Sequence, residues 1–331
     1  MAEPVLVLPR AAYRRNRTRW LETRRSGIGG SDAAAVLGLS PWSSPLSLWL
    51  DKVHGGDDAR RSEAMRWGTV LEDAIAREMA REHGIRLGPC PGILAHPDRR
   101  HQLATIDRYG VDRDRRPTSV VEVKTADGFA AADWDEDGPA PDHVVIQVQH
   151  QLDVTGLDVG YVAALVGGNR PRWWEVPRDD ELITDLRMAE DAFWHDHVLA
   201  GVPPEPIGHD ADGDALAELY PGDPDRQVIL DGPTRSDVES LRMLKAHIAE
   251  AKSAAELHEQ RIKAYLGDAT EGLLPDGSTA ITWRPSATTR LDSTALKASL
   301  PDVWAEYATT SEGRRLLVKK TKENRTDVAA A

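Results

Sequence analysis

The sequence predicts an α/β or α+β domain over residues 1–206, with a mixed central sheet flanked by helices, followed by a mostly helical extension with a few strands. Two patterns predict the domain, because apolar residues recur at helical spacing in several segments and β-branched runs lie between them. A third observation marks its end, since residues 207–233 are rich in Asp, Gly and Pro, as linkers are. With 331 residues the chain is long enough for a second unit, which we expect at residues 234–331.

The first helices of the domain are indicated by capping residues and periodicity. Ser31 and Asp32 precede an alanine-rich stretch, so we expect them to cap the start of a helix. The segment "WGTVLEDAIAREMAREHG", residues 67–84, places its apolar side chains on one helical stripe. Gly84 is expected to end this helix, because glycine readily adopts the left-handed conformation of a helix C-terminus.

Strands and one ambiguous segment come next. We expect strands around Asp107 and at residues 120–123. Residues 143–156 fit a helix, although alternating glutamines leave a strand as the alternative. Residues 159–176 predict a hairpin with a Gly-Gly-Asn turn, and residues 179–201 predict another amphipathic helix.

In the extension, apolar residues recur at helical spacing over residues 238–265, which predicts one long helix or a helical pair. A strand is expected at residues 279–284, and a short helix should begin at Asp292 or Ser293. Residues 314–320 predict a last strand.

Charge gives two opposing indications about the partner. Lys and Arg total 41 against 54 Asp and Glu, and a formal net charge of −13 taken alone argues against nucleic acid. However, seven arginines and only one acid, Glu22, lie between positions 10 and 25. Such a segment can dock phosphates, because screening limits the reach of distant charge. The alternative is a solvated helix face.

Composition also excludes several classes. Cys90 is the single cysteine, so a disulfide framework or an iron–sulfur cluster held by four thiolates of one chain is excluded. No apolar run approaches the roughly 20 residues of a membrane span, and "MAEPVLVLPR" lacks the features of a secretory signal. We therefore expect a cytoplasmic protein without a membrane partner.

Four charged residues stand where structure alone gives them little reason to be. Asp107 closes "LATID", Glu122 and Lys124 share one face of a predicted strand, and Glu72 borders the apolar stripe of a helix. Burying an unpaired carboxylate costs several kcal/mol, so such groups are paired or bind a cation. One interpretation is a Glu122–Lys124 ion pair on an exposed sheet face.

The other interpretation is a hydrolytic metal site. Asp107 and Glu122, from adjacent strands, would present oxygens to a hard divalent cation such as Mg²⁺, which takes few ligands from protein. Lys124 would stand beside the attacking water, where it could orient that water, help to deprotonate it or neutralise charge on a phosphate. An acid followed by Glu-x-Lys on a buried strand is the pattern of a nuclease site.

These residues resemble the PD-(D/E)xK nucleases, and among them the lambda exonuclease and YqaJ-like viral recombinase family. The resemblance covers residues 20–170 and rests on the order of five motifs. They are "WLETRRSGIGGSDAAAVLGLSPWSSPLSLW", "WGTVLED", "LATID" with "VVEVKTA", "QVQHQLDVTG" and "VAALVGG". The sequence departs from the family at Ile106 and Arg108, where proline and glycine are usual. The resemblance implies a restriction-endonuclease-like core.

The resemblance also implies the roles of individual residues. Asp107 and Glu122, with the carbonyl of Val123, are the expected ligands of Mg²⁺, with Mn²⁺ as an alternative ion. Lys124 is the expected catalytic lysine, supported by two further residues of the site, Glu72 and Gln147. A terminal 5′-phosphate is the expected ligand of three residues of the opening motif, namely Arg24, Arg25 and Ser31.

The implied activity is a Mg²⁺-dependent 5′-to-3′ exonuclease on double-stranded DNA ends that leaves 3′ single strands. The family implies a ring-shaped homotrimer and a single-strand annealing protein as partner. Two alternatives stay open: a structure-specific endonuclease on the same fold, and an inactive DNA-end-binding or assembly factor.

Overall fold

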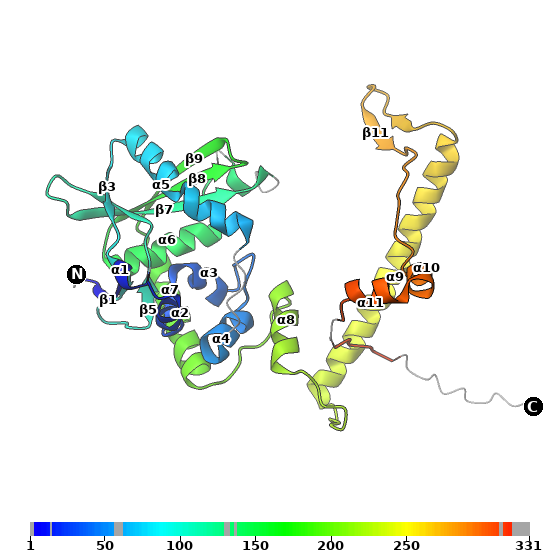
Figure 1. Cartoon of the computed structure of the whole chain (residues 1–331), viewed down its shortest axis with the longest axis horizontal. Coiled ribbons are helices and arrows are strands. Elements are labelled where there is room, and N and C mark those ends of the chain that lie inside the picture. Colours follow the sequence, from blue (N-terminus) through cyan, green and yellow to red (C-terminus); the bar gives the residue numbers. More distant parts are fainter. Residues whose placement is uncertain are drawn as a thin grey trace, which may run out of the picture. The chain divides into compact units, whose positions relative to one another are not determined.

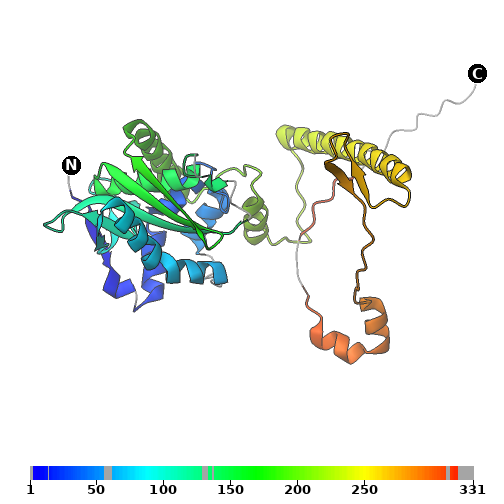
Figure 2. The ribbon, with the colours of Figure 1, turned by 90° about the horizontal axis from the view of Figure 1, so that it is seen from above.

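The computed structural model describes residues 3–13, 15–55, 62–128, 133–135, 138–310 and 314–319. It divides the chain into two compact units, Met1–Tyr220 and Pro221–Ala331 (Figures 1 and 2). The predicted α/β class is confirmed in the first unit, where helices cover a mixed sheet.

A five-stranded sheet forms the centre of the first unit. Its strands in spatial order are β3 (Arg86–Pro89), β6 (Arg108–Val111), β7 (Pro117–Ala126), β8 (Val159–Val166) and β9 (Arg170–Pro177). Strands β7 and β8 are parallel, whereas the other neighbours are antiparallel. A parallel pair requires a crossover, which helix α6 (Asp142–Thr155) supplies. The predicted hairpin is confirmed, because β8 and β9 are joined through Gly167 and Gly168, both with positive φ.

Helices α6 and α5 (Glu63–His83) pack on opposite faces of this sheet (Figure 1). Side chains alternate along a strand, so neighbouring valines of β7 face different helices. Val121 packs in one cluster with Ile75 of α5, and Val120 packs in another with Val148 of α6. Glu122, next in the alternation, therefore lies on the α6 face.

A smaller sheet completes the first unit and brings the N-terminal segment close to the central strands. Its strands in spatial order are β1 (Val5–Pro9), β4 (Gly92–Ala95), β5 (Gln102–Ala104) and β2 (Ile28–Gly29). Three helices from the same part of the chain pack near it, namely α1 (Arg10–Tyr13), α2 (Arg17–Arg25) and α3 (Gly30–Val36). Helix α4 (Pro45–His54) contacts both α2 and α3.

The helix ends were predicted with mixed success. Gly84 and Gly156 adopt the left-handed conformation directly after α5 and α6, as expected. Ser31 is not the N-cap of α3, because Gly29 holds that position and its N–H donates to Asp32 Oδ2 at 2.9 Å. The reason is tertiary, since β2 pairs with β5 as far as Gly29 and the chain enters the helix directly from the sheet.

The first unit extends beyond the predicted boundary at residue 206. Helix α7 (Asp180–Ala192) continues into a π-helical segment, η2 (Phe193–Leu199). Helix α8 (Asp210–Leu219) then packs on α4, and Ala215 is buried in a cluster with apolar residues of that helix. The range 207–233 is therefore not a linker throughout, because α8 within it packs on α4. Composition alone does not indicate this packing.

The second unit begins with a single long helix, α9 (Gly232–Leu266), rather than a helical pair. The remaining elements are β10 (Glu271–Leu273), β11 (Thr279–Thr282), α10 (Ser293–Ser299) and α11 (Pro301–Tyr307). Asp292 caps α10 as predicted. Residues 314–319 are not a strand, and position 320 lies outside the described residues. In the described parts of the chain, no helix is both long and apolar enough to cross a membrane.

Candidate active site

The two carboxylates of the candidate site, Asp107 and Glu122, meet where β6 and β7 pair. Arg108, the first residue of β6, lies opposite Val121, so Asp107 comes opposite Glu122. The N–H of Val123 donates to Asp107 Oδ2 at 2.8 Å. Residues fifteen apart in sequence are thus held side by side by backbone pairing.

Glu122 is only 4% exposed, and three side chains meet its two oxygens. Lys124 Nζ lies 2.8 Å from Oε1, and Gln147 Nε2 donates to the same atom at 2.7 Å. Gln151 Nε2 donates to Oε2 at 2.8 Å, while Lys124 also donates to Gln147 Oε1 at 2.8 Å. The interpretation of Glu122 and Lys124 as an exposed surface pair is therefore wrong, because α6 covers this face of the sheet.

Helix α6 supplies both glutamines from one face. Gln147 and Gln151 are four residues apart, a spacing that stacks side chains on a helix. The helix reading of residues 143–156 is confirmed, and the strand alternative is wrong. The sequence analysis does not name Gln151 as a site residue. In a helix, however, its position four residues after Gln147 places both glutamines on the same face, and this spacing is the signal that could have identified it.

Glu72 reaches the site from α5, where it meets Arg108. Arg108 Nη1 lies 2.5 Å from Glu72 Oε1 and donates to the carbonyl of Asp107 at 2.6 Å. Its Nη2 lies 3.2 Å from Asp73 Oδ1. The residue that departs from the family pattern therefore ties α5 to the start of β6.

The electrostatics of the site centre on Asp107. Burial raises the pKa of this carboxyl well above its usual range, and the charges of Glu122 and Glu72 raise it further. The Val123 N–H and the Lys124 charge act in the opposite direction but do not outweigh them. The three acids Asp107, Glu122 and Glu72 outnumber the two cations beside them, Lys124 and Arg108, and this environment favours a bound cation.

The donor chemistry fits a small divalent ion. Asp107 and Glu122 offer carboxylate oxygens, and Val123 offers the expected carbonyl, all hard ligands of the type that Mg²⁺ and Mn²⁺ bind. Within the residues that the structure describes, no group of three or more His, Cys, Asp or Glu side chains forms a metal cage. The set suits an ion that takes one or two carboxylates and leaves its other positions to water and substrate.

Arg24 and Ser31, the predicted phosphate ligands, meet at the junction of α2 and α3. Arg24 Nη2 donates to Ser31 Oγ at 3.3 Å and lies 3.4 Å from Asp32 Oδ1. Lys52, with a side chain only 1% exposed, lies 2.6 Å from Asp32 and donates to the Arg24 carbonyl at 3.1 Å. The Arg24 guanidinium also lies over the ring of Trp20, 5.0 Å from its centroid.

Asp32 holds this group together as an anion. Burial alone would raise the pKa of its carboxyl, but the charges of Lys52 and Arg24 and the hydrogen bonds from Lys52 and Gly29 lower it to about 2. Asp32 therefore stays ionised, and it counters two cations with one negative charge. The sequence does not predict that Lys52 and Asp32 support the phosphate ligands, because only the folded chain brings these two residues into contact.

A cavity of about 190 Å³ joins the two groups, since Arg24 and Ser31 line it together with Asp107, Glu122 and Gln147. Trp20, Gly29 and Gly30 complete the wall nearest the helix start. Arg25 is not brought to this cavity, because it pairs with Asp51 at 3.2 Å. Lys124 lines a neighbouring cavity of about 1070 Å³, and its Nζ contacts Glu122 and Gln147 of the smaller one.

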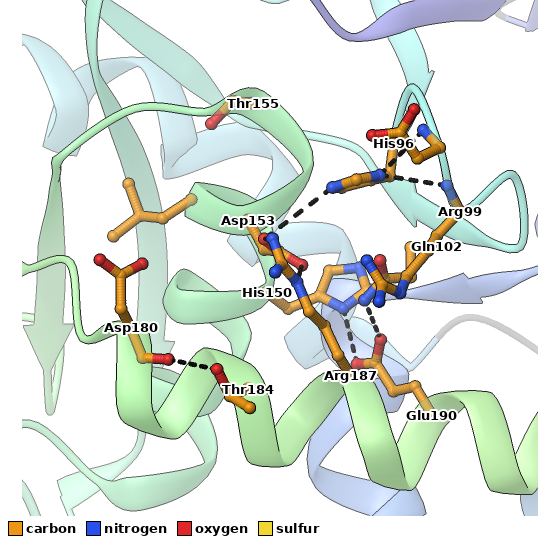
Figure 3. Close-up of polar contacts among 12 residues, drawn as sticks. His96, Arg99, Gln102, His150, Asp153, Thr155, Asp180, Thr184, Arg187 and Glu190 are labelled. Carbon is orange, nitrogen blue, oxygen red and sulfur yellow. Dashed lines mark hydrogen bonds and ion pairs between the residues drawn. The ribbon is translucent and has the colours of Figure 1, made fainter. Parts of the chain in front are cut away.

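A buried polar network supports α6 behind the site. Figure 3 shows His150, Gln102 and Glu190 pointing toward one another. His150 Nδ1 lies 2.7 Å from Glu190 Oε1 and Nε2 lies 2.8 Å from the Leu103 carbonyl, while Gln102 donates to Glu190 Oε2 at 2.7 Å. One turn further, Asp153 pairs with Arg187 of α7. These contacts fix α6 against β5 and α7, and so fix the glutamines.

The first unit thus combines an α/β fold with a pair of carboxylates on its central sheet. Residues 19–158 of this unit match the family model of the YqaJ-like viral recombinase domain. The matched range contains every predicted site residue. The chain belongs to this family, because it is 35% identical over 309 residues to the uncharacterized protein YqaJ of Bacillus subtilis strain 168, covering 92% of this chain and 95% of that protein. The resemblance predicted from the motifs is thereby confirmed.

Other likenesses are weaker. A probable nicotinate-nucleotide adenylyltransferase of Roseiflexus sp. strain RS-1 is 26% identical over 227 residues, covering 68% of this chain and 96% of that protein. Among solved structures, an alkaline exonuclease from Laribacter hongkongensis superimposes with a TM-score of 0.47 at 19% identity, covering 61% of this chain and 100% of that one.

Proposed function

We propose that the first unit is a divalent-metal-dependent deoxyribonuclease that degrades duplex DNA from a 5′ end and leaves a 3′ single strand. The observation that carries the proposal is the shared cavity, in which Arg24 and Ser31 lie on the same walls as Asp107 and Glu122. An arginine and a hydroxyl at a helix start suit a terminal phosphate, whereas the buried carboxylates suit a hard cation. If Arg24 and Ser31 hold the terminal phosphate beside the hydrolytic centre, they would fix how far from the 5′ end the strand is cleaved.

The chemistry assigned to the site is phosphodiester hydrolysis. The oxygen of a water attacks phosphorus, the bond from phosphorus to the 3′-oxygen breaks, and the departing oxygen takes up a proton. An ion held by Asp107 and Glu122 would act as a Lewis acid on the phosphate and make the water more acidic. Lys124, held by Glu122 and Gln147, would orient the water or offset negative charge on the phosphate.

This cleavage regenerates the group that the anchor takes. When the 3′-oxygen of the terminal nucleotide departs, the shortened strand carries a new 5′-phosphate. Arg24 and Ser31 could then take this phosphate in the next cycle. Repeated removal of nucleotides from one strand follows, and its partner is left as a 3′ single strand.

Two further arginines beside the site support DNA as the substrate despite the net charge of −13. Arg10 and Arg17 line a cavity of about 790 Å³ that shares Trp20 and Asp107 with the smaller one. Phosphates of the duplex would meet these arginines at short range, where distant acids are screened. The ring-shaped homotrimer and the single-strand annealing protein remain part of this proposal on the strength of the family resemblance.

One assay tests the proposal. The whole chain is incubated with Mg²⁺ and three substrates, namely a 5′-phosphorylated linear duplex, a nicked circle and a closed circle, alongside Lys124→Ala. We expect progressive loss of the linear duplex from its 5′ ends, no cutting of the closed circle and no loss with the variant.

The alternatives give different outcomes. Cutting of the closed circle would favour a structure-specific endonuclease. Binding of linear ends without cleavage would favour an inactive end-binding factor, with Ile106 and Arg108 as its sequence signature. Loss of the duplex from 3′ ends would contradict the assigned polarity.

A further inference from the structure

Arg108 is a partly buried cation at the edge of the candidate active site. Its side chain is 14% exposed, and its two terminal nitrogens contact three oxygens, two from α5 and one from the backbone before β6. These are Glu72 Oε1 at 2.5 Å, the Asp107 carbonyl at 2.6 Å and Asp73 Oδ1 at 3.2 Å. A guanidinium presents its donors in a rigid plane and stays charged, so this arrangement is a fixed positive charge.

Of the two acids of α5 that Arg108 contacts, Glu72 depends more on its positive charge. Asp73 is half exposed and has a second partner, because Arg77 lies 2.7 Å from its other oxygen. Glu72 is 23% exposed, and Arg108 is the cation that the described residues place against it. Without Arg108, the acids of α5 would add to the negative charge already present at Asp107.

The oxygens that Arg108 contacts are of the type that a hard cation binds. A second divalent ion in a hydrolytic centre lies about 3.5–4 Å from the first and shares ligands with it. Glu72 and Asp107 line one cavity, and Arg108 already contacts both the Glu72 carboxylate and the Asp107 carbonyl. A divalent ion could bind there only by displacing the guanidinium from its pairs.

We propose that Arg108 takes the place of a second metal ion in this chain, so that the centre binds one divalent ion through Asp107 and Glu122. The inference rests on the proposed function, because it presumes that the carboxylates hold a metal. Glu72 then supports the site through Arg108, as a positioning residue, and is not itself a metal ligand. On the Glu72 side of the centre, the positive charge is then the single charge of the Arg108 guanidinium, which does not depend on the metal concentration.

Counting bound Mn²⁺ tests the proposal without any measurement of activity. The whole chain, free of DNA, is titrated with Mn²⁺, and free Mn²⁺ is followed by electron paramagnetic resonance. We expect one ion per chain for the wild type and two for Arg108→Gln, because Glu72 and the Asp107 carbonyl become available. The double variant Glu72→Gln/Arg108→Gln should return to one ion.

The matched control is Arg81→Gln, which removes an exposed ion pair with Glu78 on the same helix and should leave one ion. Two ions on the wild type, or one ion on folded Arg108→Gln, would overturn the inference. If Arg108→Gln does not fold, as judged by its thermal melt, the wild-type count still tests the inference, because two ions per chain would overturn it. Failure of the proposed function looks different, because the wild type would then bind no ion, or Asp107→Asn would bind as many as the wild type.

Discussion

The pairing of His150 with Glu190 should make the first unit less stable at alkaline pH. Both side chains are completely buried. Both ring nitrogens of His150 face acceptors, the Glu190 carboxylate and the Leu103 carbonyl, so the doubly protonated ring satisfies both contacts. Loss of one proton would leave a ring lone pair facing an oxygen.

The size of the effect follows from the pKa. Burial alone would lower the pKa of His150, but the charge of Glu190 and the two hydrogen bonds raise it from 6.5 to about 9. A tenfold change in proton affinity is about 1.4 kcal/mol, so this rise corresponds to about 3 kcal/mol of stability. Because the folded-state pKa is the higher one, this stability is fully present below pH 6.5 and is lost as the pH rises through about 9.

Urea unfolding at a series of pH values checks this expectation. Eight of the ten tryptophans lie before residue 221, so tryptophan fluorescence reports mainly on the first unit. Between pH 6 and pH 9.5, the free energy of unfolding of the wild type should fall by about 3 kcal/mol relative to Glu190→Gln. His247→Gln, an exposed histidine of α9, should follow the wild type. Parallel curves for wild type and Glu190→Gln would refute the reasoning.

Three further predictions concern the site itself. Gln147→Leu should lower the cleavage rate by about 10- to 100-fold with the fold retained, because Lys124 and Glu122 lose the side chain that orients both; an unchanged rate would exclude that role. Arg24→Gln should slow cleavage of 5′-phosphorylated duplex by about tenfold more than that of 5′-hydroxyl duplex. Arg25→Gln, which removes a pair with Asp51 and does not line the cavity, should not change this ratio. Lys52→Met should cost about 3 kcal/mol in urea unfolding at pH 7, because it leaves Asp32 charged and buried, and Lys52→Met/Asp32→Asn should recover most of the loss. The Asp32 contribution is present above pH 3.8 and should disappear as the pH falls through about 2, so the gap between wild type and Lys52→Met should close in acid.

The sequence predicted much of the central fold because its elements carry strong local signals. Helix α5 has a regular apolar stripe and a terminal glycine, and β7 is β-branched on its dry face. The boundary at residue 206 was missed for the opposite reason. Helix α8 is short and carries three Asp and one Gly, and only its packing on α4 accounts for its place in the first unit.

The sequence by itself determined the family, the order of the motifs and the set of acids, since these are properties of residue identity and spacing. Only the tertiary structure decided that Glu122 and Lys124 are enclosed, that Arg24 and not Arg25 lines the cavity, and that Arg108 pairs with Glu72. The physical reason is that burial and ion pairing depend on which element covers which face. The contacts of α2 with α4, and of α5 and α6 with the central sheet, join residues far apart in the chain, and local periodicity does not encode them.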